Sequence, residues 1–116
     1  MNDKKPFVQF TIKSNKMKNV VVLFNAPGGT SAQYDKVWDG LRAAGESNPK
    51  GLISHVGAAK PDGSWFVCDI WESEEDFKEF GKVLMPLIAT SGLPPAEPMV
   101  LPAHYVYIGE TEKMHA

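Results

Sequence analysis

The sequence contains a single cysteine, and this scarcity limits the chemistry that it can carry. Cys68 cannot form a disulfide within the chain, and one thiolate alone cannot hold a structural metal ion. Such low cysteine usage is typical of reducing compartments, so we expect a cytoplasmic protein. The first residues, 1–6, also lack the basic-then-apolar pattern of a signal peptide.

Long apolar runs and an excess of positive charge are also missing. No run approaches the roughly 18 apolar residues of a membrane span, so we expect no membrane partner. The formal net charge is −2, whereas nucleic-acid-binding domains usually carry a basic patch. The one basic cluster, Lys13, Lys16 and Lys18, is better explained as a solvated turn. We therefore expect no nucleic-acid partner.

The length of 116 residues and the hydrophobic content of 43% predict one domain with a modest core. We place this domain at residues 19–109. Residues 1–18 form an N-terminal extension, in which 7–13 alternate apolar and polar side chains as a short additional strand would. Residues 110–116 form a polar C-terminal tail.

Hydrophobic patterns predict six elements in the domain. Thr30 and Gln33 have the spacing of a capping box, and Ser73 is a second N-cap followed by acidic residues. Pro86 should kink the second helix, and Pro102 predicts that the last strand lies at a sheet edge. The predicted elements are a strand at 20–26, a helix at 31–44, a hairpin over 51–72, a helix at 74–91 and a strand at 99–108.

The hairpin has a turn whose chemistry fixes its register. Lys60-Pro61-Asp62-Gly63-Ser64 fits a type I turn followed by a glycine bulge, a three-residue connection. A two- or four-residue loop would pair His55 with Cys68 and would split the apolar residues between the two faces. The predicted cross-strand pairs are His55 with Asp69, Gly57 with Val67 and Ile53 with Trp71.

This register separates the hairpin into two faces. One is nearly all apolar and suits packing under helices, so Cys68 on it should be a buried, inert thiol. The other is chemically mixed and should point away from the helices. The apolar face contains Leu52, Ser54, Val56, Ala58, Phe66, Cys68 and Ile70. The mixed face contains Ile53, His55, Trp65, Val67, Asp69 and Trp71.

The order strand, helix, strand, strand, helix, strand predicts a ferredoxin-like α+β sandwich. Right-handed crossovers place both helices on one face of a four-stranded antiparallel sheet. The other face would then expose tryptophans and aliphatic side chains, which a second copy can cover. We therefore predict a homodimer in which two sheets face each other, with the mixed face between them.

Several segments resemble the dimeric α/β-barrel superfamily, and within it the small domains similar to antibiotic biosynthesis monooxygenases. The resemblance covers about residues 18–109 and rests on element order and on three segments. These are Tyr34, Trp38 and Leu41 in the first helix; residues 67–73 with Phe77 and Phe80 beyond; and the connector 92–95 followed by His104. It implies a two-sheet barrel and one of several activities, because the superfamily includes cofactor-free monooxygenases, haem-degrading enzymes, polyketide-processing enzymes and uncharacterised members.

His55 and Asp69 form the leading candidate for catalysis. A carboxylate that accepts from one imidazole nitrogen fixes the tautomer and strengthens the other nitrogen as a general base. Such a base could deprotonate a phenol or enol, whose carbanion reacts with oxygen without a metal. The alternative is a structural cross-strand pair. His104 would be a second acid or base if the last strand borders the first, or otherwise an ordinary rim histidine.

Trp65 and Trp71 could stack on a flat aromatic ligand, or could simply pack at an interface. Asn25, late in the first strand, is a further ligand-contact candidate, because haem-degrading relatives use a strand asparagine and a strand tryptophan. Those relatives also use a histidine on the second helix, and residues 74–91 contain none. We therefore expect no haem, no metal site and no other cofactor.

The function predicted from the sequence is that of a small-molecule-binding dimeric barrel. It would be a cofactor-free monooxygenase-like enzyme acting on an aromatic or polyketide-like compound. The alternative is a non-catalytic ligand-binding or stress-associated barrel dimer.

Overall fold

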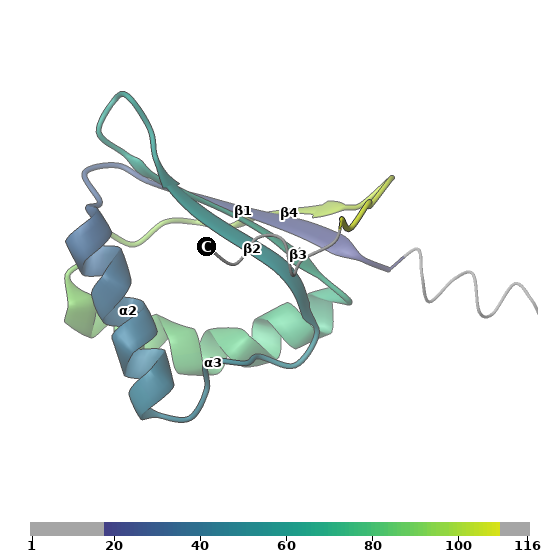
Figure 1. Cartoon of the computed structure of the whole chain (residues 1–116), viewed down its shortest axis with the longest axis horizontal. Coiled ribbons are helices and arrows are strands. Elements are labelled where there is room, and N and C mark those ends of the chain that lie inside the picture. The colour runs from purple at the N-terminus through teal and green to yellow at the C-terminus, as the bar shows by residue number, and fades with distance from the viewer. Residues whose placement is uncertain (1–17, 110–116) are drawn as a thin grey trace, which may run out of the picture.

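The computed structural model describes residues 18–109, which form a four-stranded sheet with two helices on one face (Figure 1). The strand order is β2-β3-β1-β4, and every pair is antiparallel. The predicted ferredoxin-like order is thereby confirmed, whereas residues 7–13 lie outside the described part. The elements are β1 (Val20–Ala26), α2 (Ser31–Ala43), β2 (Leu52–Ala59), β3 (Trp65–Trp71), α3 (Glu74–Ser91) and β4 (Met99–Pro102).

Both helices begin at the caps that the sequence predicts. The Thr30 hydroxyl accepts a hydrogen bond from the Gln33 amide, and the Gln33 side chain accepts one from the Thr30 amide, each at 3.1 Å. The Ser73 hydroxyl accepts from the amide of Asp76 at 3.1 Å. Gly92, in the left-handed conformation at φ 85°, ends α3. These local interactions fix where each helix leaves the sheet.

The hairpin turn and the register next to it agree with prediction. Lys60 and Ser64 close the turn through the Lys60 amide and the Ser64 carbonyl at 2.9 Å, and Gly63 has φ 88°. His55 lies opposite Asp69, and Gly57 lies opposite Val67. The two candidate catalytic residues are therefore cross-strand neighbours.

The far end of the hairpin differs from prediction, because Trp71 pairs with Leu52 and not with Ile53. The register shifts between Leu52 and Ser54, so β2 carries a bulge there. The extra residue turns Leu52 toward the helices, where it packs against the core with Trp71. In a regular strand, residues three positions apart point to opposite faces. The bulge instead places Leu52 and His55 on the same face.

The assignment of the two sheet faces was wrong, because the mixed face lies under the helices. Trp71 packs against Phe77 and Phe80 of α3, with ring centroids 5.8 and 5.5 Å apart. Trp65 packs against Tyr34 of α2 at 4.9 Å. The large indole rings fill the space between the layers, and the polar groups beside them have partners there, so burial costs little.

The apolar face of the hairpin is therefore the open face of the sheet, which we call the outer face. Cys68 lies on it and is partly exposed, so the prediction of a helix-covered thiol was also wrong. Three of its aliphatic side chains are 43–57% exposed: Val56, Met99 and Leu101. In Figure 1 no helix covers this side of the sheet. The outer face contains Val21, Leu23, Asn25, Ser54, Val56, Ala58, Phe66, Cys68, Ile70, Met99 and Leu101.

The last strand is shorter than predicted. β4 ends at Pro102, which has no amide hydrogen to donate, and β4 forms the sheet edge beside β1. The Ala103 amide still donates to the Asn19 carbonyl at 2.9 Å, but no strand continues over 103–108. Within residues 18–109, neither helix has the length and apolar character needed to cross a membrane.

Candidate functional site

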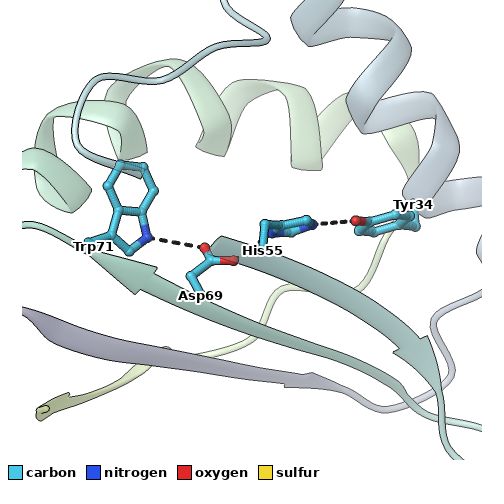
Figure 2. A network of polar contacts seen from close by, with 4 residues as sticks. All are labelled: Tyr34, His55, Asp69 and Trp71. Carbon is cyan, nitrogen blue, oxygen red and sulfur yellow. Dashed lines mark hydrogen bonds and ion pairs between the residues drawn. The ribbon is translucent and has the colours of Figure 1, made fainter. Parts of the chain in front are cut away.

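A chain of four polar side chains runs across the helix-covered face of the sheet (Figure 2). The Tyr34 hydroxyl is hydrogen-bonded to His55 Nε2. His55 Nδ1 lies 2.5 Å from Asp69 Oδ1, and the Trp71 indole donates to Asp69 Oδ2 at 3.1 Å. Three elements contribute, since Tyr34 is on α2, His55 on β2, and Asp69 and Trp71 on β3.

With His55 in its neutral form, these hydrogen bonds assign a proton to each group. The Asp69 carboxylate can only accept, so His55 Nδ1 bears a hydrogen. In a neutral imidazole the other nitrogen, Nε2, is then an acceptor, and the Tyr34 hydroxyl donates to it. Each hydrogen bond in the network is therefore donated toward Asp69, whose carboxylate accepts from both His55 and Trp71.

Asp69 is the most deeply placed charged group in this chain of side chains, with 5% of its surface exposed. A buried carboxylate is tolerated when donors surround it. His55 and Trp71 supply one donor to each oxygen. Trp71 is itself fully buried, so it holds Asp69 from behind.

The position of Tyr34 depends on a glycine in the facing strand. A Cβ atom added to Gly57 would lie 2.7 Å from both Cζ and Oη of Tyr34, well inside van der Waals contact. The missing side chain lets the phenol ring lie on β2, where its ring plane is within 3° of that of His55. Trp38, one helical turn along α2, contacts the edge of His55 at a centroid distance of 5.1 Å.

Burial raises the pKa of the Tyr34 phenol above its ordinary value of 10.0. The charges of Asp69 and Asp35 act in the same direction, while a hydrogen bond from Trp38 acts against it. The phenol therefore remains protonated near neutral pH, as its role as the donor to His55 requires.

A cavity of about 70 Å³ lies beside this chain, between the sheet and the two helices. Its polar wall is formed by Tyr34, His55 and Asp69, and the rest is apolar or aromatic. One water needs about 10–15 Å³, so this volume holds several waters or one small ring. The apolar wall consists of Phe24, Ala26, Val37, Trp38, Leu41, Leu52, Trp65, Val67, Phe80, Leu84, Met85, Ile88, Leu93, Pro94, Pro95 and Ala96.

The structure brings three of the predicted site residues together at this cavity: His55, Asp69 and Trp65. The Trp65 indole nitrogen is buried and has no hydrogen-bond partner within residues 18–109. Buried donors without a partner are rare, and a bound molecule or water often supplies the missing acceptor.

The other three predicted site residues do not line the cavity. Trp71 lies behind Asp69 in the core. Asn25 is exposed on the outer face, where its side-chain oxygen accepts from Lys60 at 3.1 Å and Ser64 at 3.3 Å. His104 is exposed beyond the end of β4.

Sequence reasoning used Tyr34 and Trp38 only as part of the family resemblance and named neither as a site residue. One signal could have indicated more. Glycine inside a strand often marks the close approach of another group, and Gly57 lies two residues from His55. Within the described part of the chain, no cluster of three or more histidine, cysteine or acidic residues could hold a metal ion.

Comparisons with known proteins give matches among solved structures only: no protein-family model and no curated protein matches this chain. The oxygenase SnoaB of Streptomyces nogalater, described as cofactor-independent and solved in a mutant form, is 17% identical, with a TM-score of 0.58 over 77% of this chain and 96% of that one. The monooxygenase ActVA-Orf6 of Streptomyces coelicolor, solved with nanaomycin D, is 20% identical, with a TM-score of 0.54 over 85% and 98%.

A third match, Rv0793 of Mycobacterium tuberculosis, is 17% identical, with a TM-score of 0.55 over 78% of this chain and 99% of that one. Each of the three structures is covered almost entirely, so the likeness extends through the whole ferredoxin-like unit. At these identities the likeness concerns the fold and not the activity. The chain therefore shares the ferredoxin-like fold of these three structures.

Proposed function

We propose that this protein binds a small, largely apolar molecule between its sheet and helices and acts on it by acid–base chemistry, as a monooxygenase-like enzyme without a cofactor. The observation that carries the proposal is the His55–Asp69 pair, 2.5 Å apart, in the polar wall of an otherwise apolar cavity. Asp69 holds the imidazole in one tautomer and would stabilise the imidazolium that forms when His55 accepts a proton.

The chemistry follows from removing one proton from a phenol or enolisable ketone. The resulting enolate donates electrons from carbon to molecular oxygen, and a carbon–oxygen bond forms. The second oxygen atom leaves as water, so a CH₂ group becomes a carbonyl. Both electron pairs come from the substrate, and the reaction needs no other reductant.

The lining of the cavity favours an aromatic or polyketide-like substrate, and its volume suits a single ring. Trp38 and Trp65 provide flat surfaces for stacking, and the polar groups lie on one side. The likeness to SnoaB and ActVA-Orf6 supports this substrate class as an analogy of fold. A cytoplasmic location remains a prediction from the sequence.

A non-catalytic ligand-binding or stress-associated barrel is the second candidate function. One observation favours it: both ring nitrogens of His55 are already engaged, by Tyr34 and Asp69. An imidazole without a free nitrogen cannot take a proton from a substrate unless a partner moves or passes the proton on.

The partner that we propose is a second copy of this chain, bound through the outer face. This face is almost entirely apolar, and Val56, Met99 and Leu101 are among the most exposed large hydrophobic residues of the sheet. A contiguous apolar surface of this kind is rarely left exposed to water. The homodimer predicted from the sequence would thus pair the apolar faces and leave the cavities within each protomer.

Oxygen uptake with 1,3-cyclohexanedione, an enolisable ketone with one ring, tests the enzymatic proposal. Wild-type protein should accelerate uptake, and the His55→Ala variant should lose about a hundredfold or more, as expected when a general base is removed. His104→Ala is the matched control, because that histidine is exposed and is not among the residues that line the cavity. Equal rates in the two variants would contradict the general-base role.

A further inference from the structure

The two nitrogens of His55 leave no site at which this base can meet a ligand directly. Nδ1 donates its hydrogen to Asp69, and Nε2 accepts the hydrogen of the Tyr34 hydroxyl. The Trp38 ring contacts the edge of the imidazole, which narrows access further. A proton from a bound molecule must therefore reach Nε2 through another group.

The Tyr34 oxygen is the group placed to pass it. A phenol oxygen can donate one hydrogen bond and accept others at the same time. Its hydrogen is directed to His55, and beside the Trp38 hydrogen bond the oxygen has one further acceptor position for a neighbour in the cavity, whose wall Tyr34 helps to form. Tyr34 also contacts Trp65, whose indole nitrogen is the buried donor without a partner among the described residues.

Asp69 is less suited to meet a ligand. It is 5% exposed, and each of its oxygens already accepts a hydrogen bond. Apart from Tyr34, His55 and Asp69, the residues that line the cavity have apolar or aromatic side chains. Tyr34 is therefore the polar group through which a ligand and the His55–Asp69 pair can exchange a proton.

We propose that Tyr34 is a catalytic residue that contacts the hydroxyl group of the substrate and relays its proton to His55. This inference rests on the proposed acid–base function of the cavity. The substrate proton moves to the Tyr34 oxygen, while the Tyr34 proton moves to His55 Nε2. The products are a substrate oxyanion, a neutral Tyr34 and an imidazolium paired with the Asp69 carboxylate, so protons and charge balance.

The relay also defines the substrate class more closely. The molecule carries one acidic hydroxyl, phenolic or enolic, at the end of a flat apolar body. The oxyanion that forms accepts a hydrogen bond from the Tyr34 hydroxyl, a charge-assisted bond in a largely apolar cavity. Because burial raises the pKa of Tyr34, the phenol does not lose its own proton permanently to His55.

Ionisation of 4-nitrophenol in the cavity tests the relay, because the anion of this one-ring phenol absorbs visible light. Four forms of the full chain are titrated with pH in the presence of the probe: wild type, Tyr34→Phe, His55→Gln, and a protein with 3-fluorotyrosine at position 34. Thermal unfolding of each form establishes that it is folded, and fluorotyrosine keeps the hydroxyl that phenylalanine lacks.

At neutral pH, we expect the ratio of bound anion to bound phenol to be at least about tenfold lower in Tyr34→Phe than in wild type. The reason is that the variant loses one hydrogen bond to a charged group. His55→Gln should show the same loss, and the fluorotyrosine protein should resemble wild type. If Tyr34→Phe ionises the probe as well as wild type while His55→Gln does not, the relay is overturned but the proposed function remains intact.

Other outcomes separate the two proposals further. If the fluorotyrosine protein ionises the probe as poorly as Tyr34→Phe, the hydroxyl is not the relay, and the inference fails alone. If His55→Gln ionises the probe as well as wild type, or if wild type does not bind it, the proposed acid–base function fails and the relay fails with it.

Discussion

Gly57 shows how one missing side chain organises the site. Its Cα hydrogen faces the Tyr34 ring, and a methyl group there would lie 2.7 Å from Cζ and Oη. The Gly57→Ala substitution should push the ring off β2 and break its hydrogen bond to His55. We expect a loss of about 1–3 kcal/mol in unfolding free energy, typical of overpacking, and reduced ionisation of 4-nitrophenol. Chemical denaturation and the probe titration measure the two effects.

Gly81→Ala provides the matched control for that substitution. Gly81 lies within α3, and an added Cβ would meet no heavy atom within 4 Å. Alanine in a helix is more favourable than glycine by about 0.5–1 kcal/mol, so this variant should be more stable than wild type. A Gly57→Ala protein that matches it in stability and in probe ionisation would show that the close approach of Tyr34 is unimportant.

The raised pKa of Tyr34 predicts how stability depends on pH. Burial and the charge of Asp69 keep the phenol protonated in the folded state to higher pH than in the unfolded chain. Stability should therefore be retained below pH 10.0, the ordinary value, and fall as pH rises through the folded pKa. Tyr34→Phe should show a smaller fall in unfolding free energy across this alkaline range.

Cys68 must be separated from this effect, because burial also raises its pKa above 9.0. The Cys68 thiol also stabilises the folded state while it is protonated. This contribution starts to decline at a lower pH than that of the Tyr34 phenol. Measurements in a Cys68→Ser background isolate the tyrosine. An unchanged alkaline slope after Tyr34→Phe in that background would mean that another group causes the fall.

Sequence could predict part of this residue network. The pairing of His55 with Asp69 followed from the turn, because antiparallel register is a local consequence of loop length. The contribution of Tyr34 could not be predicted in the same way, since it requires knowing which sheet face α2 covers. That contact joins residues 21 positions apart in the sequence, and no local pattern encodes it.

At the scale of elements, local chemistry predicted where helices and the hairpin turn begin and end. Features that depend on long-range packing were predicted less well. The helix caps and the hairpin turn form hydrogen bonds within a few residues, and all occur as expected. The bulge near Ile53 has no such local signal. It arises because Leu52 reaches the hydrophobic core only if the strand gains a residue.

The inverted sheet faces have a physical explanation. β1 is apolar on both sides, so its pattern does not show which side the helices cover. On the hairpin, the more polar face was taken as the outer one, but its His55 and Asp69 side chains are hydrogen-bonded beneath the helices. The face left open is apolar, a character typical of surfaces that bind a partner.

For the whole molecule, element order was sufficient to predict the fold. Two strand–helix–strand units with right-handed crossovers leave one common arrangement, and the sheet order β2-β3-β1-β4 matches it. Proteins under 25% identical share this arrangement almost end to end. The order of elements therefore constrains the fold more than the identity of most residues does.

The inverted faces also change how the molecule should assemble. A dimer formed through the outer face would bury aliphatic side chains from all four strands and leave each cavity enclosed by its own sheet and helices. The site would then be complete within one protomer. Loss of the dimer should consequently affect stability more than ionisation of a bound phenol.

Val56→Lys tests this arrangement, because Val56 is 54% exposed on the outer face, midway along the edge strand β2. Burying a charge in an apolar interface leaves it without a partner, which commonly costs several kcal/mol. We expect wild type to sediment as a dimer at micromolar concentration and Val56→Lys as a monomer. Ala89→Lys, an exposed substitution on α3, should remain a dimer. A monomeric wild type would remove the second copy as the partner, and a dimer that survives Val56→Lys would place the interface elsewhere on the molecule.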